Sequence, residues 1–357
     1  MISEVKIKNF KSFIDAKIPL SKLTLLTGLN SSGKSSIIQA LRMYDLAHSG
    51  KSPLLMGHGG IAELRSKFVA PKENISISLT THNNVEATLT LNEYNTTPPT
   101  YAPELIYVGA DRLGPQPNLP IDQSLNSNPR VGEKGEYVLD FISRLVDQNY
   151  ILPSAFKHET SQSLTFDHIL QNWLSEITPG VKFNFSHNKK ADVSHAEIDS
   201  CRPTNVGFGL SYTLPIIAAA LGSVAQPNNK TNNEHWVDTW EKYKKNNGVL
   251  LIIENPEAHL HPKGQTAMGK LLALCAQQGS QVIIETHSEH VMDGIRIAIK
   301  QQALPNTAVK FHYFSKNTFG ESQVKSPNID ENAKIDSWPE GFFDQTLINR
   351  AILAKRN

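Results

Sequence analysis

Hydrophobic and polar residues follow two different periods along this chain. Apolar side chains alternate with polar ones at 5–7 and 16–20, and again at 75–79 and 85–91, and this period of two predicts strands. The polar residues 81–84 lie between the second pair of strands, so this pair is a predicted β-hairpin.

Other runs are apolar throughout, as is typical of strands that are buried on both faces of a parallel sheet. These runs lie at 23–27, 105–108, 249–253 and 282–284. Helical spacing of apolar residues is found between or after them, at 37–44, 138–146, 168–177, 268–275 and 291–298. Buried strands that alternate with helices predict an α/β fold with a mostly parallel sheet.

Three further segments complete the pattern. Residues 181–185 and 191–198 are strand-like, whereas 228–247 are polar and rich in asparagine. We expect the third segment to be a surface loop that could be shortened without harm, in which Trp236 and Trp240 pack or form an interface.

A glycine-rich loop separates the strand at 23–27 from the helix after it. Gly28–Ser35 reads GLNSSGKS and matches the phosphate-loop pattern G-x-x-x-x-G-K-[ST]. Such a loop wraps its backbone around a phosphate, with N–H groups pointing inward at the positive end of a helix. Lys34, expected outside the core, would then contact the β- and γ-phosphates, and Ser35 would offer a hydroxyl to Mg²⁺. The other candidate nucleotide contacts here are Gly28, Asn30, Ser31, Ser32, Gly33 and Ser36.

A second motif follows the strand at 249–253. This strand ends in Glu254, and residues 254–262 read ENPEAHLHP. An acidic residue at the end of a buried strand is what a phosphate-loop enzyme uses to hold Mg²⁺, directly or through water. Glu254 lies more than two hundred residues after the phosphate loop, whereas many phosphate-loop enzymes place the two motifs much closer together.

Composition restricts the class of protein. The chain has 357 residues, of which 39% are hydrophobic and 19% charged, and this favours one large or two ordinary globular domains. A net charge of +1 excludes a global basic field for nucleic acid. Two cysteines without C-x-x-C spacing, no signal-peptide pattern and only short apolar runs predict a cytoplasmic protein without a membrane partner.

Together the motifs resemble the ABC-type ATPases, and more narrowly the soluble group of SMC, RecF and OLD-like proteins. Asn9–Phe13 resembles their N-terminal turn, and Asn30 matches their G-x-N-x-x-G-K-S loop. The segment 254–262 is similar to the OLD-like E-x-P-E-x-H-L-H-P, and His287 lies where the ABC switch histidine would. The resemblance implies a P-loop NTPase of the ABC-ATPase-head type, with a mostly parallel sheet, flanking helices and an antiparallel β portion.

A glycine-rich segment at 205–212 occupies the place of the ABC signature, although its wording departs from L-S-G-G-Q. By the resemblance, Gly207, Gly209 and Ser211 would contact the γ-phosphate that is held by a second subunit. The alternative is an ordinary helix N-terminus with Ser211 as its cap.

The resemblance also assigns catalytic roles at the second motif. Glu254 would bind Mg²⁺, and His287 would sense the γ-phosphate. ABC-type ATPases commonly place a water-activating glutamate next, where this chain has Asn255, which cannot accept a proton. Either Glu257 takes that role or hydrolysis is slow.

The chain divides by the same resemblance. An ATPase head would occupy 1–310, with a β-rich part at about 62–108 and an inserted, signature-bearing part at about 133–225. The remaining 311–357 resembles a C-terminal domain of unknown function found on bacterial ATPases of this group.

The implied function is a homodimeric ATPase that uses ATP and Mg²⁺. OLD-like relatives often carry a nuclease domain for which 311–357 is too short, so we expect a separate nuclease or toxin effector in bacterial defence against phage. Two alternatives stay open: a RecF-like repair ATPase with DNA as its partner, and a nucleotide-dependent scaffold with negligible turnover.

Overall fold

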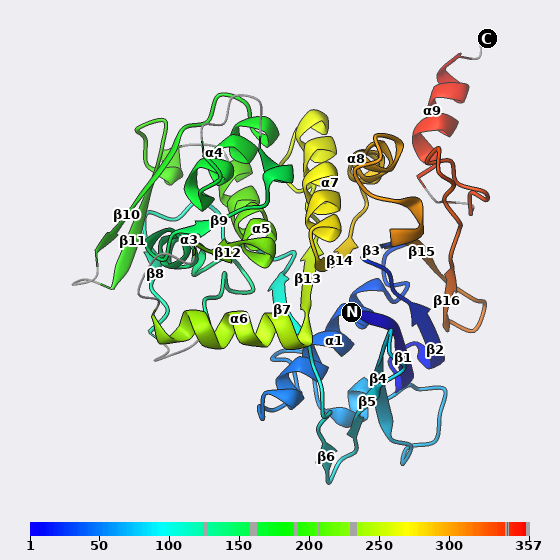
Figure 1. Ribbon diagram of the computed structural model, residues 1–357. Helices are drawn as coiled ribbons and strands as arrows, with labels where there is room; N and C mark the ends of the chain where they lie inside the picture. Colours follow the sequence, from blue (N-terminus) through cyan, green and yellow to red (C-terminus); the bar gives the residue numbers. More distant parts are fainter. Residues whose placement is uncertain are drawn as a thin grey trace. The chain divides into compact units, whose positions relative to one another are not determined.

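The computed structural model describes residues 1–123, 128–157, 163–188, 192–205, 208–228, 234–339, 341 and 343–354. It is drawn as a ribbon in Figure 1. The chain forms two compact units, which are described in turn. Unit 1 consists of Met1–Pro103 and Pro305–Asn357, and unit 2 of Glu104–Leu304. Among the described residues, the helices are all too short or too polar to cross a bilayer.

Unit 1 contains an antiparallel sheet with the strand order β2-β1-β4-β5-β6. Its strands are β1 (Ile2–Phe10), β2 (Phe13–Pro19), β4 (Ile75–Thr81), β5 (Glu86–Leu91) and β6 (Thr96–Thr97). The alternation seen in the sequence places one apolar face of this sheet inside the unit, where Ile7, Ile77 and Leu89 are buried. The predicted N-terminal strands and the hairpin at 75–91 are confirmed.

The parallel strands of unit 1 come from opposite ends of the chain. The strand β3 (Leu23–Gly28) pairs in parallel with β15 (Val309–Lys316), and Gly28 lies opposite Phe314. The strand β16 (Ser322–Lys325) pairs with β15 in the antiparallel sense. The expected boundary between 310 and 311 therefore falls inside a paired strand.

Helix α1 (Lys34–His48) follows β3 directly and buries Ile37, Leu41 and Tyr44. The Tyr44 hydroxyl donates to the carbonyls of Tyr101 and Ala87 at 2.7 and 3.2 Å. The shorter elements of unit 1 are α2 (Ile61–Leu64), η3 (Asn306–Ala308) and α9 (Gln345–Ala354).

A buried histidine ties β15 to its neighbours in unit 1. His312 Nε2 lies 2.7 Å from Pro19 O, which can only accept, so this nitrogen carries the proton. The other ring nitrogen, Nδ1, lies 2.7 Å from Ser326 Oγ. Burial lowers the pKa of His312 from 6.5 to about 4, and the ring is therefore neutral at pH 7.

Unit 2 is built on three parallel strands. The central strand β13 (Val249–Glu254) pairs with β7 (Glu104–Val108) on one side and β14 (Ser280–Glu285) on the other. All three were predicted as buried strands, and their carboxyl ends lie at the same edge. Helices α7 (Pro262–Gln277) and α8 (Glu289–Lys300) follow β13 and β14.

Two glycines let α7 and α8 cross closely. A β carbon at Gly269 would lie 2.3 Å from Val291 O, and one at Gly294 would lie 2.2 Å from Thr266 O. Larger residues at either position would push the helices apart, so this crossing fixes where the segments that precede both helices lie.

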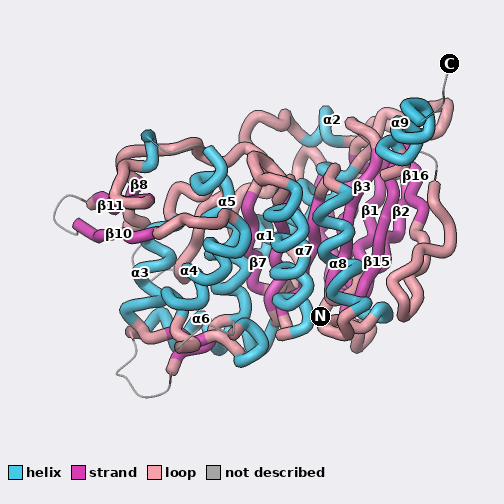
Figure 2. Tube along the Cα trace, turned by 90° about the horizontal axis from the view of Figure 1, so that it is seen from above, coloured by secondary structure: helices cyan, strands magenta, loops and turns pink. Residues whose placement is uncertain are grey.

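The rest of unit 2 is mainly helical (Figure 2). Its helices are α3 (Val138–Asp147), α4 (Phe166–Ile177), α5 (Phe208–Val224) and α6 (His235–Asn247), with η1 (Ser154–Phe156) and η2 (Pro203–Asn205). The short strands are β8 (Leu119–Pro120), β9 (Tyr150–Ile151), β10 (Phe183–Asn188), β11 (Val193–Ile198) and β12 (Gln226–Pro227). Parallel strands with helices, together with the antiparallel sheet of unit 1, confirm the predicted α/β fold class.

Helix α6 corrects one sequence prediction, because most of the expected surface loop at 228–247 is helical. Trp236 and Trp240 are buried, and Trp240 Nε1 donates to Glu104 Oε1 at 2.7 Å. The buried Lys244 ammonium lies 4.0 Å from the Trp240 ring centroid and 2.7 Å from Glu241 Oε1. Helix α6 is therefore part of the core of unit 2, and we expect its removal to destabilise this unit. Residues 229–233 of the expected loop lie outside the described residues.

Candidate functional site

The phosphate loop of unit 1 has a backbone that its glycines make possible. Gly28 and Gly33 have φ values of +134° and +115°, and Ser31 between them has +59°. A β carbon at Gly28 would lie 2.1 Å from Phe314 O of β15, so only glycine fits there. The side chains of Asn30, Ser31 and Ser35 are exposed, and α1 begins at the next residue after Gly33.

Lys34 is buried inside this loop, with only 3% of its surface exposed. Its ammonium donates to Gly28 O and Leu29 O, both at 2.9 Å, and Ser32 Oγ donates to Leu29 O at 2.6 Å. The expectation that Lys34 lies outside the core is wrong, because the loop's own carbonyls satisfy a buried charge. Ser36 donates its N–H to Gly33 O at 3.0 Å and so belongs to the first turn of α1.

The turn between β1 and β2 packs against the same loop. Asn9 and Lys11 have positive φ values, and the Lys11 ammonium donates to Gln39 of α1. Burial lowers the pKa of Lys11. A β carbon at Gly33 would lie 2.8 Å from the Phe13 ring, so this turn sets one wall of the loop.

In unit 2, the segment Glu254–Pro262, called the acid turn below, leaves β13 with an unusual backbone. Asn255 has a φ of +45°, and its N–H donates to Glu285 O at 2.8 Å. The Glu254 carboxylate accepts a hydrogen bond from the Tyr107 hydroxyl at 3.0 Å. Glu254 is thus oriented by a side chain of the neighbouring strand β7.

A buried arginine that sequence reasoning missed holds this turn. Arg112 is 2% exposed, and its Nη1 donates to Gly109 O and Glu254 O, each at 2.7 Å. Its Nη2 donates to Asn255 O at 2.7 Å, while Nε has no partner among the described residues. Burial lowers the pKa of Arg112, against the opposing effect of Glu257 and Glu254. The sequence signal was an arginine shortly after the predicted buried strand at 105–108.

Glu257 links the acid turn to the end of β14. Its Oε2 accepts from the Thr286 hydroxyl at 2.7 Å, and its Oε1 accepts from the His287 N–H at 2.9 Å. The His287 side chain is exposed, and Ser288 after it caps α8. Unit 2 therefore brings together Glu254, Asn255, Glu257 and His287, while the catalytic roles expected for them stay predictions.

The start of α5 lies against the acid turn. Gly207 is outside the described residues, whereas Gly209 is close enough that an added β carbon would lie 3.3 Å from His259 O. The Tyr212 ring lies 4.5 Å from the His259 ring and 5.4 Å from the Arg112 guanidinium. Because α5 begins at Phe208, Ser211 lies within the helix and is not its N-cap.

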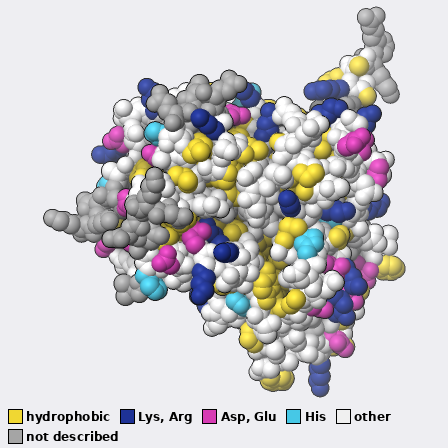
Figure 3. All heavy atoms as spheres, viewed as in Figure 1, with side chains coloured by type: hydrophobic (Ala, Val, Ile, Leu, Met, Phe, Trp, Pro, Cys, Tyr) yellow, Lys and Arg dark blue, Asp and Glu magenta, His cyan; other side chains and the backbone are white. Residues whose placement is uncertain are grey.

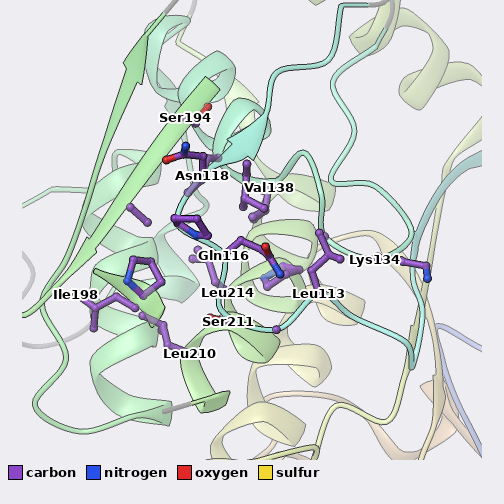
Figure 4. Close-up of a pocket in the computed structure, with 18 residues that line it drawn as sticks. Leu113, Gln116, Asn118, Lys134, Val138, Ser194, Ile198, Leu210, Ser211 and Leu214 are labelled. Atoms are coloured by element: carbon purple, nitrogen blue, oxygen red, sulfur yellow. The ribbon is translucent and has the colours of Figure 1, made fainter. Parts of the chain in front are cut away.

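Ser211 lines a partly open pocket of unit 2, whose empty space is about 480 Å³ with open solvent included. Figure 4 shows its side chain with Leu210 and Leu214 of α5 on one side of this space. Most of the lining is apolar, and the polar side chains include Gln116, Asn118 and Ser194. The candidate signature serine thus belongs to the wall of a largely apolar hollow.

The histidines of the acid turn have local contacts. His261 is the N-cap of α7, where its Nδ1 accepts from Lys263 N at 3.4 Å, and His259 contacts Tyr212. Across the described ranges, His, Cys, Asp and Glu side chains do not gather in threes as a metal site. Lys and Arg side chains are interspersed with Asp and Glu on the face in Figure 3, which carries no continuous basic stripe.

Comparison with known families gives two matches. A family model described as an AAA ATPase domain matches residues 1–96 and 121–292. A second model, described as a protein of unknown function, DUF3696, matches residues 304–351. No curated protein matches the chain. The expected ATPase and the expected C-terminal domain of unknown function are both confirmed.

Solved structures give weaker likenesses. The chain is similar to the SMC head domain from Thermotoga maritima, with 14% identity and a TM-score of 0.46, over 92% of this chain and 99% of that one. It is also similar to an Smc head domain with an extended coiled coil bound to the C-terminal domain of ScpA, from Pyrococcus furiosus. That likeness has 13% identity and a TM-score of 0.48, over 99% of both chains.

Proposed function

Since the chain belongs to the AAA ATPase domain family, we propose that it binds ATP with Mg²⁺ and couples slow or assisted hydrolysis to dimerisation. The observation that carries this proposal is the phosphate loop. Its backbone has positive φ values at Gly28, Ser31 and Gly33, as is typical of a loop that binds a phosphate with its N–H groups, and α1 begins right after Gly33. Lys34 would contact the β- and γ-phosphates, and Asn30, Ser31 and Ser35 present exposed polar side chains.

Each of the two expected Mg²⁺ ligands, taken by itself, has the chemistry that this ion prefers. Ser35 places an exposed hydroxyl at the first turn of α1, and Glu254 ends β13 with an oriented carboxylate, and both are hard oxygen ligands. When bound, Mg²⁺ would neutralise charge on the phosphates. The chain's own part is to hold these oxygens in place, through Tyr107 for the carboxylate and through Arg112 for the backbone of Glu254.

Glu257 is our first candidate for the group that accepts a proton from the attacking water. A second candidate function is a nucleotide-gated switch with negligible turnover. It is favoured by the hydrogen bonds that the Glu257 carboxylate already accepts, because they compete with its use as a base. Both of its oxygens accept hydrogen bonds from the β14 end, and Asn255 offers no base in its place. A carboxylate has about four acceptor positions, so these two bonds leave room for a water.

The proposed dimer would use the start of α5. Gly209 and Ser211, with Gly207 before them, would contact the γ-phosphate held by the other subunit, and His287 would sense the same group. Mixing Lys34→Ala protein with Gly209→Asp protein tests this. Each mixed dimer would keep one intact composite site, so ATPase activity should return when subunits exchange, and no recovery would contradict the arrangement.

We further propose a separate nuclease or toxin as the effector, in bacterial defence against phage. The support is the similarity of 254–262 to the OLD-like segment. Affinity purification with identification of the co-purifying proteins tests this proposal. A nuclease or toxin would support it, and DNA-repair proteins would favour the RecF-like alternative instead.

Calorimetry with Mg-ATP tests the nucleotide site itself. Lys34→Ala should weaken binding by about 2–3 kcal/mol, the scale of charge-assisted hydrogen bonds. Because Lys34 is buried, thermal unfolding must be recorded alongside, with the exposed Lys325→Ala as control. Unchanged affinity in a folded Lys34→Ala protein would refute the assignment.

A further inference from the structure

A hydroxyl from the C-terminal segment holds one peptide group of the phosphate loop. Ser322, the first residue of β16, donates its Oγ proton to Ser32 O at 2.6 Å. Both residues belong to unit 1, and Ser322 lies in the part of the chain that matches only a family of unknown function. We propose that Ser322 is a positioning residue that orients the Ser32–Gly33 peptide for phosphate binding, an inference that rests on the proposed nucleotide site.

Peptide geometry explains how a bond to a carbonyl acts on an N–H group. A trans peptide is planar, and its C=O and N–H point in opposite directions. The Ser322 hydroxyl fixes the direction of the Ser32 carbonyl, so the N–H of Gly33 points away from β16. A phosphate loop binds its anion with N–H groups that are turned inward in this way.

Ser322 is itself held by the turn between β1 and β2. Its N–H donates to Ser12 O at 3.0 Å, and the two hydroxyl oxygens lie 2.6 Å apart. Because the single hydroxyl proton of Ser322 goes to Ser32 O, Ser12 must donate to Ser322. The three groups form a chain of hydrogen bonds in which each bond strengthens the next.

Ser322 packs closely against the phosphate loop. A β carbon at Gly33 would lie 2.5 Å from Ser322 Oγ, so the Ser322 side chain packs directly on the backbone of the loop. At the other end of the loop, Gly28 lies directly against the backbone of Phe314 in β15. The hairpin β15–β16 therefore contacts both ends of the loop.

The proposal is tested by measuring the affinity for Mg-ATP in variants of Ser322 and Ser12. Ser322→Ala should weaken binding about three- to tenfold, the range for one lost hydrogen bond, and Ser322→Thr should restore most of it. Ser12→Ala removes only the donor to Ser322 and should cause a smaller loss. Gln323→Ala, an exposed neighbour on β16, is the matched control and should bind like the wild type.

Thermal unfolding without nucleotide separates positioning from simple support of the fold. Weaker Mg-ATP binding with an unchanged melting temperature, rescued by threonine, supports the proposal. A lower melting temperature with unchanged affinity overturns it, and so does equal weakening in Gln323→Ala. If Ser322→Ala does not fold, Ser12→Ala carries the same comparison. Binding that is lost in Lys34→Ala but intact in the serine variants would refute this inference alone, whereas no binding by the wild type would refute the nucleotide site.

Discussion

The phosphate loop and the acid turn both follow a parallel strand, yet they are fixed in different ways. In the loop, Lys34 bonds to carbonyls only five and six residues before it. In the acid turn, Arg112 holds the carbonyls of Glu254 and Asn255 from 142 and 143 residues away. The difference teaches that a motif can be recognised from its own residues when its bonds are local, but not when a distant side chain sets its shape.

The largest expected effect tests what the acid turn does beyond holding its shape. Glu257→Gln should lower single-turnover ATP hydrolysis by about 10²–10⁴-fold, because the amide cannot accept a proton. The substitution is nearly isosteric, and the amide oxygen can still accept from the His287 N–H. Rapid-quench measurement of one turnover is the readout, with the exposed Glu331→Gln as control. A wild-type rate would leave Glu257 as a structural link and favour the switch.

The second prediction removes the long-range hydrogen bonds that Arg112 makes to the acid turn. Arg112→Ala should lower the free energy of unfolding of unit 2 by about 3–5 kcal/mol, because the carbonyls of three residues lose a buried charged donor. Lys134 pairs with Asp111 at 2.6 Å and both side chains are more than half exposed, so Lys134→Ala should cost less than about 1 kcal/mol. Urea unfolding compares the two, and equal losses would contradict the role of Arg112.

The third prediction concerns unit 1, which carries the phosphate loop, and how its stability depends on pH through His312. The pKa of His312 is about 4 in the folded protein and 6.5 when unfolded, so the unfolded chain binds more protons between these values. Stability is therefore full above pH 6.5 and falls by about 3 kcal/mol as the pH drops towards 4. Burial raises the pKa of Asp45 to about 6, and this opposes the loss equally in every variant that keeps Asp45. Urea unfolding from pH 7 to 4 should therefore show the His312 contribution as the difference between the wild type and His312→Gln, and the exposed His287→Gln should behave like the wild type. The same pH dependence in His312→Gln and the wild type would contradict this role of His312.

The smallest expected effect tests whether the backbone of the acid turn can shift to accept a larger neighbour at Gly209. Gly209→Ala places a β carbon 3.3 Å from His259 O, so that carbonyl must move by a few tenths of an ångström. Alanine favours the helix by about 1 kcal/mol, which should offset the shift and leave the free energy of unfolding within about 0.5 kcal/mol. A loss above about 2 kcal/mol, measured by urea unfolding, would show that the turn is rigid.

The sequence predicted the strands, the loop and the helix α1 because each depends on local period or on a contiguous motif. It failed at α6, where asparagine-rich composition concealed a helix. Trp236, Trp240 and Lys244 are spaced at i, i+4 and i+8 on one face, and this spacing was the helical signal. Buried aromatic packing outweighed the polar composition.

The site was predicted less completely than the fold. The members of the acid turn were identified, but Arg112 was not, because its role depends on the register of β7 beside β13. Lys34 was expected outside the core, since the sequence does not show that its ammonium would meet two carbonyls of its own loop. The places of Gly209 and Ser211 relative to a second subunit stay predictions.

The pairing of β3 with β15 also bears on how the protein is made. Ser32 and Ser322 are 290 residues apart, and at 5–20 residues per second a ribosome needs roughly 15–60 s to travel between them. During that interval the nascent loop lacks both the strand beside it and the hydroxyl that orients Gly33. Ribosome-bound chains that stop before β15 should therefore not retain ATP, and nucleotide capture becomes a late event of synthesis, coming long after the loop itself has left the ribosome.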